Sequence, residues 1–231
     1  MIAGLLAASV LEVLFVGNSL TYANDLPEKV ASLTRSAGVE MKVRTIAFPD
    51  HSLGDHWARG DAAKAIRTGR FDFVVLQQGP SAAPENREIL RADARRFAAL
   101  IREHGGRPAL YLVWPSRQRA GDWDGVVASH AAAAESADAT LLPVGDAWRR
   151  ALSCDPPLAL YGRDGFHPSA LGTDLAALVI AAGLTQRPPS SFRAALTIQS
   201  SRHVPPERVG ATVTALEESA AQALSPAPQT R

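Results

Sequence analysis

Short apolar segments alternate with helical segments five times along this chain. The apolar segments are rich in β-branched and aromatic residues, which is typical of buried strands. They span residues 12–16, 41–47, 71–76, 109–114 and 140–144, and helical spacing is found between them at residues 26–37, 52–68, 87–104 and 125–137. This alternation predicts a three-layer α/β domain with a five-stranded, mostly parallel sheet, because parallel neighbours need a crossover connection such as a helix.

The length of 231 residues suits one domain with an ample hydrophobic core. We expect an N-terminal tail at residues 1–10, the α/β domain at residues 11–187 and a C-terminal extension at residues 188–231. A helix over residues 169–182 completes the domain. The extension contains a helix over residues 206–224, followed by a disordered tail rich in Pro, Ala and Gln.

Net charge and cysteine content restrict the class of protein to which the chain can belong. The formal net charge is +1, so nothing indicates a nucleic-acid or membrane partner. Cys154 is the single cysteine, which excludes an internal disulfide and fits a reducing compartment. The apolar first residues lack a basic region, so we expect a cytoplasmic protein, or a secreted one if residues 1–10 are the remnant of a leader. The sequence makes no prediction of oligomeric state.

Three residues far apart in the sequence carry the chemistry of a nucleophilic serine site. Ser19 follows the first predicted strand, and Asp164 and His167 lie three residues apart in a turn that contains Gly165 and ends at Pro168. Asp164 can accept a hydrogen bond from His167 Nδ1, which leaves Nε2 free to take the serine proton. The alternative is a serine that caps a helix and a capping aspartate beside a surface histidine. The strand-end position of Ser19 together with the Asp–His pair favours catalysis.

Further polar or aromatic residues follow predicted strands. Gln77 and Gln78 come directly after the third strand, and Trp114 ends the fourth. Ligand sites in α/β sheets form beyond the carboxyl ends of the strands, so we expect these side chains near Ser19. Trp114 can stack on a ligand or belong to the core. We expect Asn18 to hold the loop of Ser19 through side-chain hydrogen bonds.

Two blocks of the sequence resemble those of the SGNH hydrolases, the GDSL lipase and esterase superfamily. Residues 16–20 read Val-Gly-Asn-Ser-Leu and are similar to the first block, with Asn18 where many members carry Asp. Residues 164–168 read Asp-Gly-Phe-His-Pro and match the last block, Asp-x-x-His-Pro. Residues 17–27 also resemble a bacterial subgroup whose first block opens with Gly-Asn-Ser. The resemblance covers residues 12–183 and implies a flavodoxin-like α/β/α fold.

The same resemblance implies roles for the three residues and for backbone donors of an oxyanion hole. Ser19 would be the nucleophile and a backbone donor, His167 its base, and Asp164 the residue that orients the base. The second family block supplies another backbone N–H, usually from a glycine. Gly54 is the obvious candidate here, but an ungapped alignment places Leu53 in that position. Either N–H would lie in the first turn of a helix, where donors are free.

The third family block departs most from the superfamily pattern. Its usual Asn, which donates to the oxyanion, is absent, and residues 76–81 read Leu-Gln-Gln-Gly-Pro-Ser. The resemblance makes Gln77 the first candidate for this donor, with Gln78 and Ser81 as alternatives. Gln77 could instead bond only to the backbone at the edge of the sheet.

Together these features predict a serine esterase that hydrolyses small acyl esters, such as acetyl esters of carbohydrates, without a cofactor or metal. The resemblance leaves two alternatives open: an acyltransferase on the same fold and a non-catalytic carbohydrate-binding domain. His51, Asp55 and His56 lie close together in the sequence, but no further cluster completes a metal site. We expect His56 to line the pocket or a helix face.

Overall fold

The computed structural model describes residues 10–154 and 158–225. Residues 1–9 of the predicted N-terminal tail and residues 226–231 of the predicted disordered tail lie outside the described residues. The proposed division of the chain between residues 187 and 188 remains a prediction.

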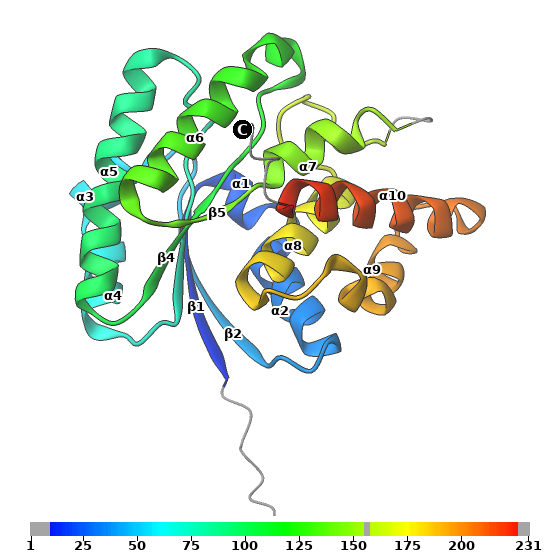
Figure 1. The fold of residues 1–231 in the computed structure, drawn as a ribbon, viewed down its shortest axis with the longest axis horizontal. Helices are drawn as coiled ribbons and strands as arrows, with labels where there is room; N and C mark the ends of the chain where they lie inside the picture. Colours follow the sequence, from blue (N-terminus) through cyan, green and yellow to red (C-terminus); the bar gives the residue numbers. More distant parts are fainter. Residues whose placement is uncertain (1–9, 155–157, 226–231) are drawn as a thin grey trace, which may run out of the picture.

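Five strands of the described chain form one parallel sheet, as predicted, and their order in the sheet is β2-β1-β3-β4-β5 (Figure 1). The strands are β1 (Leu11–Gly17), β2 (Met41–Ala47), β3 (Phe73–Leu76), β4 (Arg107–Tyr111) and β5 (Thr140–Leu142). From β1 the chain runs outward to β2 and then crosses to β3 on the other side of β1. Such a reversal of strand order opens a crevice at the carboxyl ends of the two strands beside it. Here those strands are β1 and β3.

Helices cover both faces of the sheet, which confirms the three-layer α/β/α prediction (Figure 1). The longer helices are α2 (Leu26–Ser36), α3 (Leu53–Arg59), α4 (Asp61–Thr68), α5 (Pro84–Glu103), α6 (Trp123–Ala137), α7 (Val144–Ala151), α8 (Ala170–Thr185), α9 (Arg193–Ser200) and α10 (Pro206–Leu224). Val13 and Phe15 of β1 belong to the buried cluster that includes α2 and α8. Leu14 and Val16 belong to the cluster that includes α4 and α5. Successive strand residues point to opposite faces, so each strand contributes to both cores.

Two helices replace the single helix predicted over residues 52–68. Gly60 ends α3 with a φ of 85°, in the left-handed region that glycine adopts without steric cost, and its N–H donates to His56 O. The predicted cap at Ser52 is confirmed. Its side chain accepts from the Asp55 N–H, and the Asp55 carboxylate accepts from the Ser52 N–H in return.

Two of the longer helices were not predicted. α7 begins at Val144, where the sequence predicted the end of a strand, so β5 is shorter than expected. α9 lies in the predicted C-terminal extension, whose other helix, over residues 206–224, is confirmed as α10. Both α9 and α10 contribute buried residues to the hydrophobic cluster that surrounds α8, among them Leu196 and Leu216.

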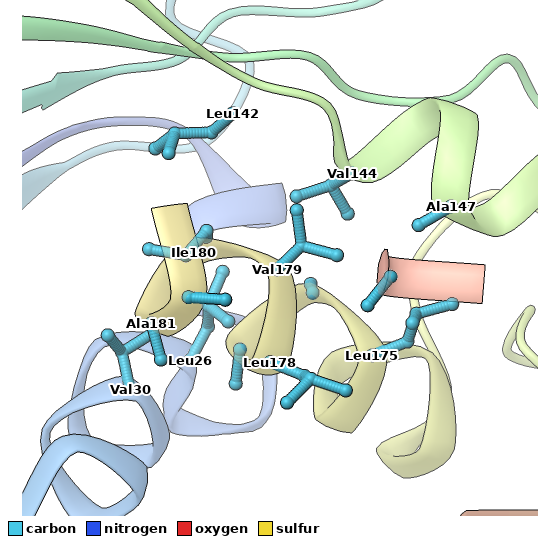
Figure 2. Packing of buried hydrophobic residues seen from close by; sticks show 14 of the residues in the cluster. Leu26, Val30, Leu142, Val144, Ala147, Leu175, Leu178, Val179, Ile180 and Ala181 are labelled. Atoms are coloured by element: carbon cyan, nitrogen blue, oxygen red, sulfur yellow. The ribbon is translucent and has the colours of Figure 1, made fainter. Parts of the chain in front are cut away.

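Nearly the whole surface of α8 is buried, because α2, α7, α9, α10 and the sheet surround it. Figure 2 shows Leu26 and Val30 of α2 on one side of this helix and Val144 and Ala147 of α7 on another. A helix that is apolar all round is expected in such a place. It carries one acidic residue, Asp174, whose carboxylate accepts from groups on α2, on α9 and just after α9: Lys29 Nζ at 2.5 Å, Ser200 Oγ at 3.2 Å and His203 Nε2 at 2.8 Å.

None of the helices in the described ranges combines the length and the apolar character that a membrane crossing requires.

Candidate active site

The loop after β1 carries Ser19 at the crevice between β1 and β3. Asn18 caps the short helix α1 (Ser19–Tyr22): its Oδ1 accepts from the Leu20 N–H at 3.2 Å. Its Nδ2 donates to His51 O at 3.1 Å, which ties this loop to the connection after β2. The predicted role of Asn18 in holding the loop is therefore confirmed.

Gly17 is required at the turn into this loop by close packing. A Cβ atom at this position would lie 2.3 Å from Thr21 Oγ1 and 2.4 Å from Gln77 Oε1. Both neighbours are buried and hydrogen-bonded to each other, so neither is free to move away. The loop can therefore approach β3 this closely only with glycine at position 17.

Asp164 and His167 lie in a compact turn that contacts Ser19. Asp164 Oδ1 accepts from the N–H groups of Phe166 and His167, each at 3.0 Å, and Oδ2 lies 2.5 Å from His167 Nδ1. The hydrogen bond from His167, followed by that from the Phe166 N–H, lowers the pKa of Asp164 to about 2. Gly165 makes the turn possible with a φ of 71°. Asp164 is therefore a carboxylate at neutral pH, and its negative charge faces the His167 ring.

The turn places His167 directly against the serine. His167 Nε2 lies 2.9 Å from Ser19 Oγ, so the three side chains form a continuous chain from carboxylate to hydroxyl. The structure thus brings together Ser19, Asp164 and His167, which the sequence singled out across about 145 residues. His167 and Asp164 are about half exposed, with relative side-chain areas of 43% and 52%, so water can reach them.

Neighbouring segments hold the histidine turn in place. Trp114 Nε1 donates to Phe166 O at 3.0 Å, and the Arg117 N–H donates to Gly165 O at 2.8 Å. The Trp114 ring is fully buried and stacks on Trp148 with 3.5 Å between ring centroids. Of the two roles that the sequence left open, Trp114 therefore has the core role, and it is not exposed for stacking on a ligand.

A cleft of about 700 Å³ opens beside Ser19. Its polar lining, besides Ser19 itself, includes Asn18, His51, Gln78, Asn86, Arg119 and Asp122. Arg119 Nε and Asp122 Oδ2 form an ion pair at 2.6 Å. The cleft thus combines many hydrogen-bonding groups with two large apolar side chains, Ile89 and Phe166.

The two neighbouring glutamines after β3 point in different directions. Gln78 lines the cleft, where its Nε2 donates to Ser81 Oγ at 2.9 Å and its Oε1 accepts from the Leu53 N–H at 3.0 Å. Gln77 is fully buried and does not line the cleft; its Oε1 accepts from the Asn18 N–H and from Thr21 Oγ1, each at 2.8 Å. The expectation that Gln77 faces the reacting atoms is therefore wrong, because its side chain lies beneath the serine loop.

The backbone donors expected from the second block also need correction. The Leu53 N–H already donates to Gln78 Oε1, so it is not free. Gly54 is not part of the cleft lining, and its Cα faces Asp93, whose Oδ2 would lie 2.9 Å from a Cβ at position 54. Sequence reasoning missed Asp50, which lines the cleft in a left-handed conformation with a φ of 58°. The Pro-Asp pair at residues 49–50 was the available turn signal.

The two histidines of the second block have structural partners. His51 Nδ1 lies 2.9 Å from Pro49 O, and His56 Nε2 lies 2.7 Å from Gly17 O. His56 is fully buried beneath the serine loop and does not line the cleft, contrary to one expectation. Its burial lowers its pKa, so the ring is neutral and Nε2 donates to the carbonyl. In the part of the chain that the structure describes, no group of three or more potential metal ligands gathers.

No protein-family model matches the chain, and no curated protein matches it either. Solved structures do. A candidate SGNH hydrolase from Slackia heliotrinireducens is 29% identical, with a TM-score of 0.65 over 76% of this chain and 100% of that one. A DUF4886 family protein from Bacteroides uniformis is 18% identical, with a TM-score of 0.72 over 94% and 95% of the two chains.

A variant of an acetyl-xylooligosaccharide esterase from the genus Geobacillus shares the fold, with 14% identity and a TM-score of 0.58 over 76% of this chain and 93% of that one. The parallel five-stranded sheet flanked by helices is the architecture of these SGNH hydrolases. On its fold and its similarity to the SGNH hydrolase from Slackia heliotrinireducens, the chain is an SGNH-type hydrolase.

Proposed function

We propose that the protein is a serine esterase for small acyl esters, with Ser19 as nucleophile, His167 as general base and Asp164 as its orienting carboxylate. The observation that carries the proposal is the unbroken chain of contacts from Asp164 Oδ2 to His167 Nδ1 and from His167 Nε2 to Ser19 Oγ, at 2.5 Å and 2.9 Å. This order of groups is what activation of a serine hydroxyl requires.

The proposed reaction follows from these contacts. His167 Nε2 takes the Ser19 proton as Oγ forms a bond to the ester carbonyl carbon, and the carbonyl oxygen becomes an oxyanion. The tetrahedral intermediate collapses when His167 returns the proton to the leaving alcohol, and the acyl group stays on Oγ. Water, deprotonated by the same histidine, then attacks the acyl group, and the carboxylic acid and free serine are released.

The oxyanion needs hydrogen-bond donors in the cleft, and two candidates belong to residues that line it. The Ser19 N–H is in the first turn of α1, where backbone N–H groups have no intrahelical acceptor. Gln78 Nε2 carries two hydrogens and gives one of them to Ser81 Oγ. We assign the second hydrogen of Gln78 to the oxyanion, in place of the Asn that other SGNH hydrolases use.

The proposed substrate class is an acetyl or similarly short acyl ester of a polar alcohol such as a carbohydrate. The polar lining of the cleft supports this proposal, because Asn86, Arg119 and Asp122 offer donors and acceptors for hydroxyl groups. The fold shared with an acetyl-xylooligosaccharide esterase also supports this substrate class. The Gly-Asn-Ser first block, in which Asn18 caps α1, supports a place in the bacterial subgroup that carries this block.

Two measurements test the proposal. A fluorophosphonate should label Ser19 in the native protein and leave Ser19→Ala unlabelled, because only an activated serine reacts. Turnover of p-nitrophenyl esters should be fastest for acetyl and fall towards octanoyl, and acetylated sugars should lose acetate.

Absence of labelling and of turnover in the folded protein would exclude the serine mechanism. A preference for octanoyl esters would contradict the small acyl group. Product analysis with and without an acceptor sugar distinguishes hydrolysis from acyl transfer, since only a transferase makes a new sugar ester in place of free acid.

A further inference from the structure

The peptide unit between Gly17 and Asn18, directly before Ser19, is held at both ends by buried side chains. On one side Gly17 O accepts from His56 Nε2 at 2.7 Å and from the Phe48 N–H at 3.1 Å. On the other side the Asn18 N–H donates to Gln77 Oε1 at 2.8 Å. His56 and Gln77 come from α3 and from the end of β3, so two separate elements fix the same peptide plane.

The orientation of the Gln77 amide follows from its partners. A backbone N–H can only donate, so the Gln77 oxygen and not its nitrogen must face Asn18. The same oxygen accepts from Thr21 Oγ1 at 2.8 Å, which extends the contact into α1. Gln77 Nε2 makes no hydrogen bond to any described residue, although it is buried. An unpaired buried donor is unfavourable, so an apolar residue would suit this position better if the side chain only filled space.

His56 shows the same pattern. Its Nε2 donates to Gly17 O, while its buried Nδ1 has no partner among the described residues. Both side chains therefore use one polar atom on the Gly17–Asn18 peptide and leave the other unpaired. The shared feature of the two residues is the peptide that they hold.

We propose that Gln77 and His56 are positioning residues that clamp the Gly17–Asn18 peptide and so fix Ser19 for attack, a role that rests on Ser19 being the nucleophile. Movement of this peptide would displace the Asn18–Ser19 peptide that follows it, and with it the Ser19 N–H and Oγ relative to His167 Nε2. A misplacement of about 1 Å at a reacting group can lower a rate by about 10²-fold. Neither residue touches the substrate in this role.

Matched substitutions separate clamping from simple packing. Gln77→Glu keeps an acceptor oxygen for the Asn18 N–H and Thr21, and Gln77→Met keeps the size but removes the acceptor. His56→Gln keeps an amide N–H at a similar reach, and His56→Leu removes it. Gln199→Met is the control, because Gln199 is also a buried glutamine with an unpaired amide atom but lies on α9, outside the cleft lining.

The measurements are kcat and KM for p-nitrophenyl acetate and the hydrogen-exchange rate of the Asn18 amide. We expect Gln77→Met and His56→Leu to lose about 10–100-fold in kcat with KM nearly unchanged, since the effect is on geometry at the reacting atoms. Gln77→Glu, His56→Gln and the Gln199→Met control should stay within about five-fold of the native kcat. The Asn18 amide should exchange slowly in the native protein and in Gln77→Glu and fast in Gln77→Met.

Native kcat in folded Gln77→Met and His56→Leu would overturn the proposal. If Gln77→Met does not fold, Gln77→Glu decides alone: a folded protein with native kcat and a fast-exchanging Asn18 amide, or with low kcat and a slowly exchanging one, contradicts the clamp. If the native protein hydrolyses no ester, the esterase proposal fails on that result. The Asn18 exchange rates in the same variants then still confirm or refute the clamp.

Discussion

Replacement of Gln78 by glutamate should lower kcat by about 10²–10³-fold and leave KM nearly unchanged, because the proposed bond to the oxyanion exists mainly in the transition state. The substitution keeps the shape of the side chain. It also keeps an oxygen that can accept from the Leu53 N–H, which Gln78 Oε1 does at 3.0 Å in the native protein. What it removes is the amide donor.

The expected magnitude follows from counting donors. Gln78 Nε2 has two hydrogens, and the bond of 2.9 Å to Ser81 Oγ uses one, so a single donor is left for the oxyanion. Loss of one such donor costs about 2.7–4 kcal/mol of transition-state stabilisation. Gln78 is only 5% exposed, so burial favours the neutral acid, which can donate one hydrogen. The defect of Gln78→Glu should therefore grow as pH rises and the carboxyl group ionises.

The assay is steady-state turnover of p-nitrophenyl acetate across pH, with thermal unfolding to verify the fold. Gln77→Glu is the matched control, since it makes the same chemical change one residue earlier, where the side chain lies outside the cleft. If Gln78→Glu kept kcat within about three-fold of the native value, the Gln78 amide would contribute nothing to the transition state and the assignment would be refuted. A loss confined to KM would place Gln78 in substrate binding instead.

Four further results are expected. Ser19→Ala should abolish turnover and fluorophosphonate labelling and leave the melting temperature nearly unchanged; residual turnover near the native value would contradict its role. His167→Ala should lose as much as Ser19→Ala, and Asp164→Asn less, because triad members act as a unit and part of the ring orientation survives. The pKa of Asp164 is lowered to about 2, so its carboxylate keeps its bonds to His167 below its ordinary pKa near 3.8 and loses them only as pH falls through about 2; kcat/KM should depend on pH as general-base catalysis requires, and a flat profile from about pH 5 to 8 would exclude a histidine base. Gly17→Ala should destabilise the protein by about 1–3 kcal/mol in chemical denaturation and lower kcat, because its Cβ would overlap Thr21 and Gln77; unchanged stability would show that the loop can relax.

The sequence was sufficient for features that depend on local pattern. Alternating apolar and helical segments predicted the five-stranded parallel sheet, and the helix over residues 206–224 was predicted with its observed bounds. The Asp164–His167 contact could also be predicted, because the two residues lie three positions apart in a turn that contains Gly165. Ser19 was found from its position at a strand end together with the two family blocks, and the structure places it 2.9 Å from the histidine.

The choice between Gln77 and Gln78 could not be made from their order in the chain. Successive strand residues point to opposite faces, so Gln77 continues the face of Phe73 and Val75, and Gln78 continues that of Val74 and Leu76. Which face leads to the cleft depends on where α1 and α3 pack. The structure puts α1 over Gln77 and the start of α3 against Gln78, which buries the first amide and exposes the second to the cleft.

The tertiary structure likewise determined helix boundaries and helix burial that the local sequence pattern left ambiguous. Gly60 lies within a continuous helical pattern, and its left-handed conformation separates α4 from α3, which packs beneath the serine loop through His56 and Gly17 O. α8 has no polar face of its own, and it is a stable helix because α9 and α10 cover the side away from the sheet. The periodicity of a segment shows which of its residues are apolar. The helix or strand that packs against those residues comes from a distant part of the chain, and its position determines which side chains reach the site.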